Sequence, residues 1–163
     1  LMAGSVGTSG PDRLRGAGEM GIPQIVAPGC ADLIDFAGWQ DIPEAYSDRP
    51  FHAHNRVIKS SGLNGEERRA LVGDIVARLE GAMGPVHVLM PRGGVEAWDV
   101  EGGATYDPEA LAAMVDEMER AVAAPVQLSV LECHINDAAF AEAALAVLDG
   151  WIDDGTLDRS TGA

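Results

Sequence analysis

The sequence predicts a three-layer α/β domain of the Rossmann-like type, with a mostly parallel sheet covered by helices on both faces. Three short apolar runs, Ile22–Ala27, Val86–Met90 and Pro125–Leu131, have the length and composition of buried strands. Segments with helical spacing of apolar residues alternate with them, a pattern typical of parallel sheets with helical crossovers. The length of 163 residues favours one domain, here residues 1–151, followed by a polar tail over residues 152–163.

The chain is strongly acidic, and its charge narrows the classes of partner. Lys and Arg number 11 and Asp and Glu number 26, which gives a formal net charge of −15 at pH 7. Such a surface repels nucleic acids and anionic membranes, so neither is expected as a partner. No apolar run approaches the roughly 20 residues of a membrane span, and no signal peptide pattern is present. Cys30 and Cys133 lack the spacing of a metal site, which predicts reduced thiols in a cytoplasmic protein.

The elements of the first half are predicted from glycine, proline and apolar spacing. A helix is expected over Pro11–Met20, with proline at its first position and Gly21 ending it. After the first strand, a helical turn is expected within Cys30–Ala37, followed by a polar loop over Gly38–Pro50. Phe51–Ile58 has some strand character, because apolar residues lie at both of its ends.

The second half carries clearer helix signals. Asn64 and Glu67 have the spacing of a capping box, which predicts a helix running on to Gly84. A long loop over Arg92–Tyr106 follows the second strand, and loops of this length after a core strand are often functional. Asp107–Glu109 begins the next helix with a cap and a proline, and Asn136 or Asp137 is expected to cap the last helix.

Polar residues cluster where the last strand ends, and parallel α/β sheets bind ligands at the carboxyl ends of their strands, near a topological switch point. His134 is a candidate general acid/base, with Asp99 or Asp137 orienting its ring, and Asn136 and Asp137 are candidate ligand contacts. Alternatively, Asn136 and Asp137 cap the helix and His134 bonds locally. Cys133 is discounted as a nucleophile, because neighbouring strand residues point to opposite faces.

Two glycine-rich stretches are candidate ligand-binding loops. Gly4, Gly7 and Gly10 precede a predicted helix N-terminus, where backbone amides can hold a phosphate or carboxylate; a flexible turn is the alternative. Gly93 and Gly94 follow the second strand and permit close approach of the backbone to a ligand.

A histidine-containing segment adds a third candidate group. His54 could act as a base, Asn55 could make a polar contact, and Arg56 could clamp an anion. A metal bound by His52 and His54 is less favoured, because no nearby carboxylate motif completes such a site. Trp39 and Trp98 lie in predicted loops and could cover a pocket or an interface.

Several short motifs occur along the chain in a specific order. They are Gly10–Leu14, Gly21–Val26, Pro28–Asp32, His54–Asn55, Pro91–Asp99, Tyr106–Ala110, His134–Asp137 and Phe140–Ala141. Their order and spacing resemble the second, C-terminal domain of the Tm-one-like ATP-binding family, uncharacterised bacterial and fungal proteins related to the tomato mosaic virus resistance protein. Two segments of the presumed cleft, around Asn55 and Arg92, depart from the family pattern.

The resemblance implies a protein of two Rossmann-like halves with a ligand cleft between them, of which this chain resembles the second. It implies ATP and Mg²⁺ as candidate cofactors, and a first-half subunit or a homo-oligomer as candidate partners. The main hypothesis is therefore a cleft-forming domain that binds a small anionic ligand such as a nucleotide, with Arg13, Arg56 and Arg92 supplying positive potential. The alternatives are a non-catalytic interaction module and a small-molecule enzyme using His134.

Overall fold

The computed structural model describes residues 5–157, and its larger sheet is parallel. The strand order is β1-β5-β6, with β1 at Gln24–Val26, β5 at Val86–Pro91 and β6 at Gln127–Leu131. The connections from β1 to β5 and from β5 to β6 both move in the same direction across the sheet. Right-handed crossovers of this kind place their helices on the same face.

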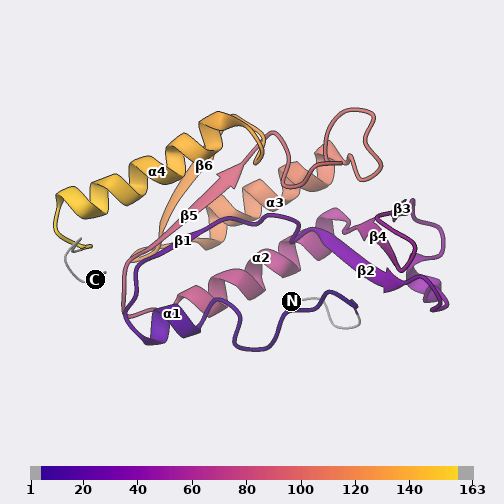
Figure 1. The fold of residues 1–163 in the computed structure, drawn as a ribbon, viewed down its shortest axis with the longest axis horizontal. Helices are drawn as coiled ribbons and strands as arrows, with labels where there is room; N and C mark the ends of the chain where they lie inside the picture. The colour runs from indigo at the N-terminus through magenta and orange to yellow at the C-terminus, as the bar shows by residue number, and fades with distance from the viewer. Residues whose placement is uncertain (1–4, 158–163) are drawn as a thin grey trace.

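Helices cover both faces of this sheet. On one face, α2 at Gly65–Leu79 packs against α3 at Pro108–Ala121, and on the other α4 at Ala138–Asp153 lies against β1 and β5. Figure 1 shows α4 on one side of the strands and α2 and α3 on the opposite side. The predicted three-layer α/β fold with a parallel sheet is thus confirmed.

A second, antiparallel sheet stands beyond the carboxyl ends of the parallel strands (Figure 1). Its order is β2-β4-β3, with β2 at Leu33–Ala37, β4 at Ile58–Gly62 and β3 at His52–Ala53. A short 3₁₀ helix, Glu44–Tyr46, lies between β2 and β3, and the one-turn helix α1, Gly16–Glu19, precedes β1.

One apolar core joins the two sheets. Val88 pairs with Val26 and with Leu128 at the centre of the parallel sheet, and it is completely buried. Phe36 of β2 and Met118 of α3 belong to the same buried cluster. This continuity explains why the antiparallel sheet folds as part of the domain.

Two predictions for the first half are wrong. The helix expected over Pro11–Met20 is reduced to α1, because Leu14 has a φ of +71° that no helix accommodates. The helical turn expected within Cys30–Ala37 gives way to strand β2 from Leu33, whose alternate residues Ile34 and Phe36 are buried. The strand character of Phe51–Ile58 resolves into two strands joined by a turn.

In the second half, the capping box is confirmed: the Asn64 side chain accepts from the Glu67 amide, and the Glu67 carboxylate accepts from the Asn64 amide. Helix α2 ends at Leu79, before the predicted Gly84, and Met83 beyond its end is exposed. Helix α4 continues through Asp153, so the start of the predicted tail is helical. No helix among residues 5–157 is both long and apolar enough to cross a membrane.

Candidate functional site

The loop that leaves β1 is the centre of the candidate site. Its backbone turns back with Cys30 at a φ of +54°. The Cys30 amide donates to the Val95 carbonyl at 3.0 Å, and the Asp32 carbonyl accepts from the Leu63 amide at 2.8 Å. Residues 27–32 are therefore tied to the loop after β5 and to the end of β4.

A pocket of about 290 Å³ opens beside this loop, and we call it the β1 pocket. The segment of residues 5–15, the N-terminal segment, forms its other wall. Its mouth carries polar groups and its floor is apolar, formed by side chains from α2, β5 and α3. No aspartate or glutamate lines it among the described residues. The lining residues are Ser5, Gly7, Thr8, Ser9, Arg13, Leu14, Val26, Ala27, Pro28, Gly29, Cys30, Ala31, Leu33, Leu71, Ile75, Val88 and Met118.

Hydrogen bonds at both ends hold the N-terminal segment in place. At one end, the Val6 amide donates to the Asp35 carbonyl at 2.9 Å, and the Asp35 amide donates to the Ser5 hydroxyl oxygen at 3.0 Å. At the other end, the Arg78 guanidinium of α2 donates to the carbonyls of Pro11 and Arg13. The segment between these anchors is the wall of the pocket.

The predicted glycines of this segment differ in their placement. Gly7 lines the pocket, and a Cβ there would come within 2.6 Å of the Asp35 carboxylate, so the backbone passes too close for a side chain. Gly10 does not line it and is open on all sides, while Gly4 lies outside the described residues. The expected helix N-terminus behind them is absent, because α1 begins only at Gly16.

The predicted loop after β5 packs closely against the exit of β6. The Gly93 amide donates to the Cys133 carbonyl at 2.9 Å, and the Ile135 amide donates to the Gly94 carbonyl at 3.0 Å. Gly94 has a φ of +128°, and a Cβ there would lie 2.5 Å from the His134 ring. Both glycines thus permit close approach of backbone to backbone.

His134 is held by hydrogen bonds on both ring nitrogens. Its Nδ1 accepts from the Asn136 amide at 3.0 Å, so that nitrogen carries no proton and Nε2 donates to the Glu96 carbonyl, also at 3.0 Å. The Asp137 carboxylate accepts from the His134 amide at 2.8 Å and does not bond to the helix that Asp137 precedes. A general acid/base role for His134, which stays a prediction, would require the ring to release Glu96.

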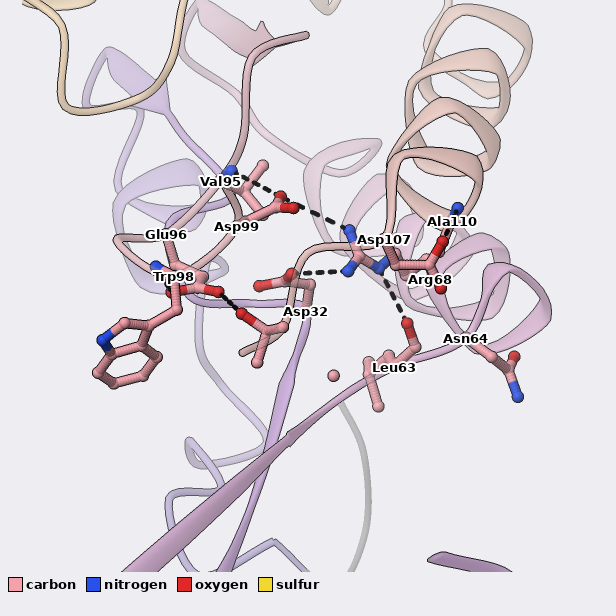
Figure 2. A network of polar contacts seen from close by, with 12 residues as sticks. Asp32, Leu63, Asn64, Arg68, Val95, Glu96, Trp98, Asp99, Asp107 and Ala110 are labelled. Atoms are coloured by element: carbon pink, nitrogen blue, oxygen red, sulfur yellow. Dashed lines mark hydrogen bonds and ion pairs between the residues drawn. The ribbon is translucent and has the colours of Figure 1, made fainter. Parts of the chain in front are cut away.

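Behind this loop lies a buried network of charged side chains, shown in Figure 2. Arg68 of α2 donates through Nε to the Leu63 carbonyl at 2.9 Å. Its guanidinium lies 3.0 Å from the Asp32 carboxylate and 3.9 Å from that of Asp99, and all three side chains are completely buried. Apart from the bond to Leu63, the guanidinium makes no hydrogen bond within the described residues, so its attraction to both carboxylates is electrostatic.

A third carboxylate, Glu96, adjoins the network. It accepts from the Trp98 amide at 2.6 Å and from the Thr105 hydroxyl. Asp99 accepts from the Val95 amide at 3.2 Å, which holds the loop in a tight turn. Asp99, predicted to be catalytic, is thus buried within the loop, and it does not line the β1 pocket.

Burial sets the protonation of this network. It raises the pKa of Asp32 to about 7, against the opposing attraction of Arg68, and the charges of Asp99 and Glu96 add to the rise. Burial also raises the pKa of Asp99, against the Val95 amide and Arg68. The network has one guanidinium and three carboxyl groups, so its net charge is −2 when all of them are ionised.

The predicted histidine group spans strand β3, which contains His52, and the turn between β3 and β4. His52 stacks on Trp98, with ring centroids 3.7 Å apart, and His54 meets the same ring edge-on at 5.5 Å. The Asn55 side chain accepts from the amides of residues 57 and 58, which shapes the turn. Arg56 is exposed, and none of these residues lines the β1 pocket.

The structure therefore separates the predicted site residues into groups. Gly7 lines the β1 pocket, and Arg13, expected to supply positive charge, lines it as well. A second group, Gly93, Gly94, Asp99, His134, Asn136 and Asp137, packs together between the ends of β5 and β6. Arg92, expected to attract an anion, is paired with Glu119 and Glu132. Among residues 5–157, no group of three metal-binding side chains is found.

The buried positions of Arg68 and Asp32 were not predicted from the sequence. The signal for Arg68 was its spacing: it precedes Leu71 by three residues and Ile75 by seven, which places it on the buried face of the helix. Asp32 carried no comparable signal, because its burial depends on β4 and on the loop after β5.

Fold and geometry define a Rossmann-like α/β domain with a pocket beside the carboxyl end of its first parallel strand. The model of the C-terminal domain of the uncharacterised protein family UPF0261 matches residues 1–152, and the chain belongs to this family. The resemblance predicted from the motifs is thereby confirmed.

Relatives extend this result to bacteria and plants. A UPF0261 protein of Brucella melitensis is 48% identical over 155 residues, covering 95% of this chain and 37% of its own length. One from Mesorhizobium japonicum is 36% identical, covering 91% of this chain and 38% of its own length. The ToMV resistance protein Tm-1 of Solanum lycopersicum is 32% identical, covering 77% of this chain and 17% of its own length. The chain thus spans a little over a third of the bacterial relatives.

Proposed function

We propose that this domain binds a small anionic ligand in the β1 pocket, as one half of a two-domain protein. The observation that carries the proposal is the composition of the pocket in a chain of net charge −15. Its described lining contains Arg13 and several hydroxyl groups but no carboxylate. Arg13 would attract an anion to the pocket, against the repulsion of nearby carboxylates. Burial raises the pKa of the Cys30 thiol, and the carboxylates of Asp32, Glu96 and Asp35 add to the rise.

The position of the pocket also supports binding. Parallel α/β sheets hold ligands at the carboxyl ends of their strands, and the β1 pocket lies beside the loop that follows Val26. The three parallel strands run in one direction without the reversal of order that marks a switch point. The position of the pocket at the end of a strand is therefore the topological feature that favours binding.

ATP with Mg²⁺ is the nucleotide candidate, through the family resemblance. Arg13 would contact one phosphate group, and Mg²⁺ bound to the phosphates would neutralise part of their charge.

Thermal unfolding of the 163-residue chain tests the proposal. A ligand at 100 times its dissociation constant should raise the free energy of unfolding by about 2.7 kcal/mol. The test panel is ATP–Mg, inorganic phosphate and small carboxylates. Arg13→Gln should remove the stabilisation, whereas Arg15→Gln, an exposed arginine two residues on that does not line the pocket, should preserve it.

The reactivity of the two free cysteines reports where the ligand binds. Cys30 lines the pocket and is exposed, while Cys133 lies at the exit of β6. A ligand in the pocket should slow alkylation of Cys30 and leave Cys133 unchanged. If stabilising ligands protected neither thiol, or if Arg13→Gln changed nothing, the β1 pocket would not be the binding site.

A second candidate function is an interaction module that assembles with a first-half partner or with itself. Its support is Trp39, which is 80% exposed in the loop after β2, and Leu145, which is 57% exposed on α4. Trp98, the other loop tryptophan, is covered by His52 and does not contribute. Light scattering of the chain and of Trp39→Ser tests assembly; a monomer in both cases contradicts self-association.

A further inference from the structure

We infer that the β1 pocket selects a compact monoanion with an apolar body, such as a branched-chain or aromatic carboxylate, over the polyphosphate of a nucleotide. The inference rests on the proposed function and names the chemical class of its ligand. Three features carry it: the volume of the pocket, the apolar floor and the single positive charge at the mouth.

The volume of the pocket favours a small ligand. Pockets for drug-sized molecules measure roughly 300–1,000 Å³, and the β1 pocket measures about 290 Å³. It has room for a head group with a short chain or one ring. A whole nucleotide would leave much of its base, sugar and phosphates outside.

The apolar part of the lining favours a ligand with an apolar body. Leu14 and Leu33 are half-buried and offer apolar surface to a ligand, whereas the lining residues Leu71 and Ile75 of α2 are almost completely buried. A polar or charged group placed against Leu14 and Leu33 would lose water without gaining a partner. A hydrocarbon group there gains the free energy of leaving water.

The charge at the mouth of the pocket favours a ligand with a single negative charge. Arg13 is the one charged residue in the described lining, and a guanidinium pairs with a carboxylate through two parallel hydrogen bonds. The Ser5 oxygen already accepts from the Asp35 amide, so its hydroxyl hydrogen is directed away from that amide and can donate to a ligand. A triphosphate would bring several negative charges to one arginine in a chain of net charge −15.

The test compares dissociation constants for five probes: acetate, 3-methylbutanoate, benzoate, inorganic phosphate and ATP–Mg. Calorimetry gives the constants, and alkylation of Cys30 against Cys133 reports the location. 3-Methylbutanoate or benzoate should bind at least tenfold more tightly than acetate, because each buries several more carbon atoms. Their neutral amides have the same shape and should bind at least tenfold more weakly than the acids.

The outcomes separate the inference from the proposed function. Arg13→Gln should weaken carboxylate binding at least tenfold, and Arg15→Gln less than twofold. If ATP–Mg or phosphate bound more tightly than both larger carboxylates and protected Cys30, the ligand class would be wrong and the site would stand. If the neutral amides bound as well as the acids, the requirement for an anion would fail. If no probe protected Cys30, both the ligand class and the site would be refuted.

Discussion

Replacing Asp32 by asparagine should make the stability of the domain rise relative to wild type as the pH rises towards neutral, because a buried carboxyl group can then no longer ionise. The folded-state pKa of Asp32 is about 7, against an ordinary value of 3.8. Between these values the folded state binds a proton that the unfolded state has released. The stabilisation that the Asp32 carboxyl group contributes to the wild type is therefore complete below about pH 4, and it is lost as the pH rises through 7.

The size of the effect follows from the difference in pKa. A difference of about 3 units at roughly 1.4 kcal/mol per unit corresponds to about 4 kcal/mol in total. Part of this change in stability occurs below pH 5. Measurement is impractical there, because the isoelectric point is near 4.4 and a protein close to zero net charge tends to precipitate. Between pH 5 and pH 8 we expect the stability of Asp32→Asn relative to wild type to rise by about 2 to 3 kcal/mol.

Urea unfolding at pH 5, 6, 7 and 8 measures this difference. Asp116→Asn is the matched control, because it removes the same charge from an exposed position on α3. Its stability relative to wild type should change by less than about 0.5 kcal/mol over the same range. A difference for Asp32→Asn that stays constant with pH, or that falls as the pH rises, would refute the account of the buried network.

Three further perturbations test other parts of the structure. Gly94→Ala should destabilise the domain by more than about 2 kcal/mol, because Gly94 has a φ of +128° and a Cβ there would meet backbone and ring atoms. Gly10→Ala should be nearly neutral, because a Cβ at Gly10 would meet no other atom. The denaturant midpoints of the two variants measure the difference. Asn64→Ala should cost about 1 kcal/mol through loss of the helix cap, with faster amide hydrogen exchange in the first turn of α2. A double-mutant cycle of His52→Ala and Trp98→Ala should give a coupling of about 1 kcal/mol, and a value near zero would mean that the stacked rings are not coupled.

How far the sequence predicts this structure depends on how local each signal is. The capping box at Asn64 and the proline and aspartate that begin α3 act over three or four residues, and they were predicted correctly. Strand β2 was missed because its stability comes from pairing with β4, some 25 residues away. The helix expected from Pro11 failed because the N-terminal segment is held by Asp35 and Arg78, contacts that no local pattern reveals.

The candidate site shows the same division. Ligands bind at the carboxyl ends of parallel strands, which directed attention to the ends of the three strands without indicating which strand end stays open. At the ends of β5 and β6, glycines allow the two loops to hydrogen-bond to each other. Both ring nitrogens of His134 are hydrogen-bonded within these loops, to the Glu96 carbonyl and to the Asn136 amide. Polar residues that resemble a ligand site in sequence are thereby used to join two loops.

The end of β1 is different, because the opposite wall of the pocket is the N-terminal segment, which is anchored near both of its ends. Between these anchors Gly7–Gly10 has little side-chain bulk with which to fill the space, so a pocket with an apolar floor persists. The same exit loop that lines the pocket with Cys30 and Ala31 carries Asp32 into the buried network one residue later. The charged network therefore fixes the position of the pocket wall, and a substitution that loosens Arg68 should disturb ligand binding without touching the ligand.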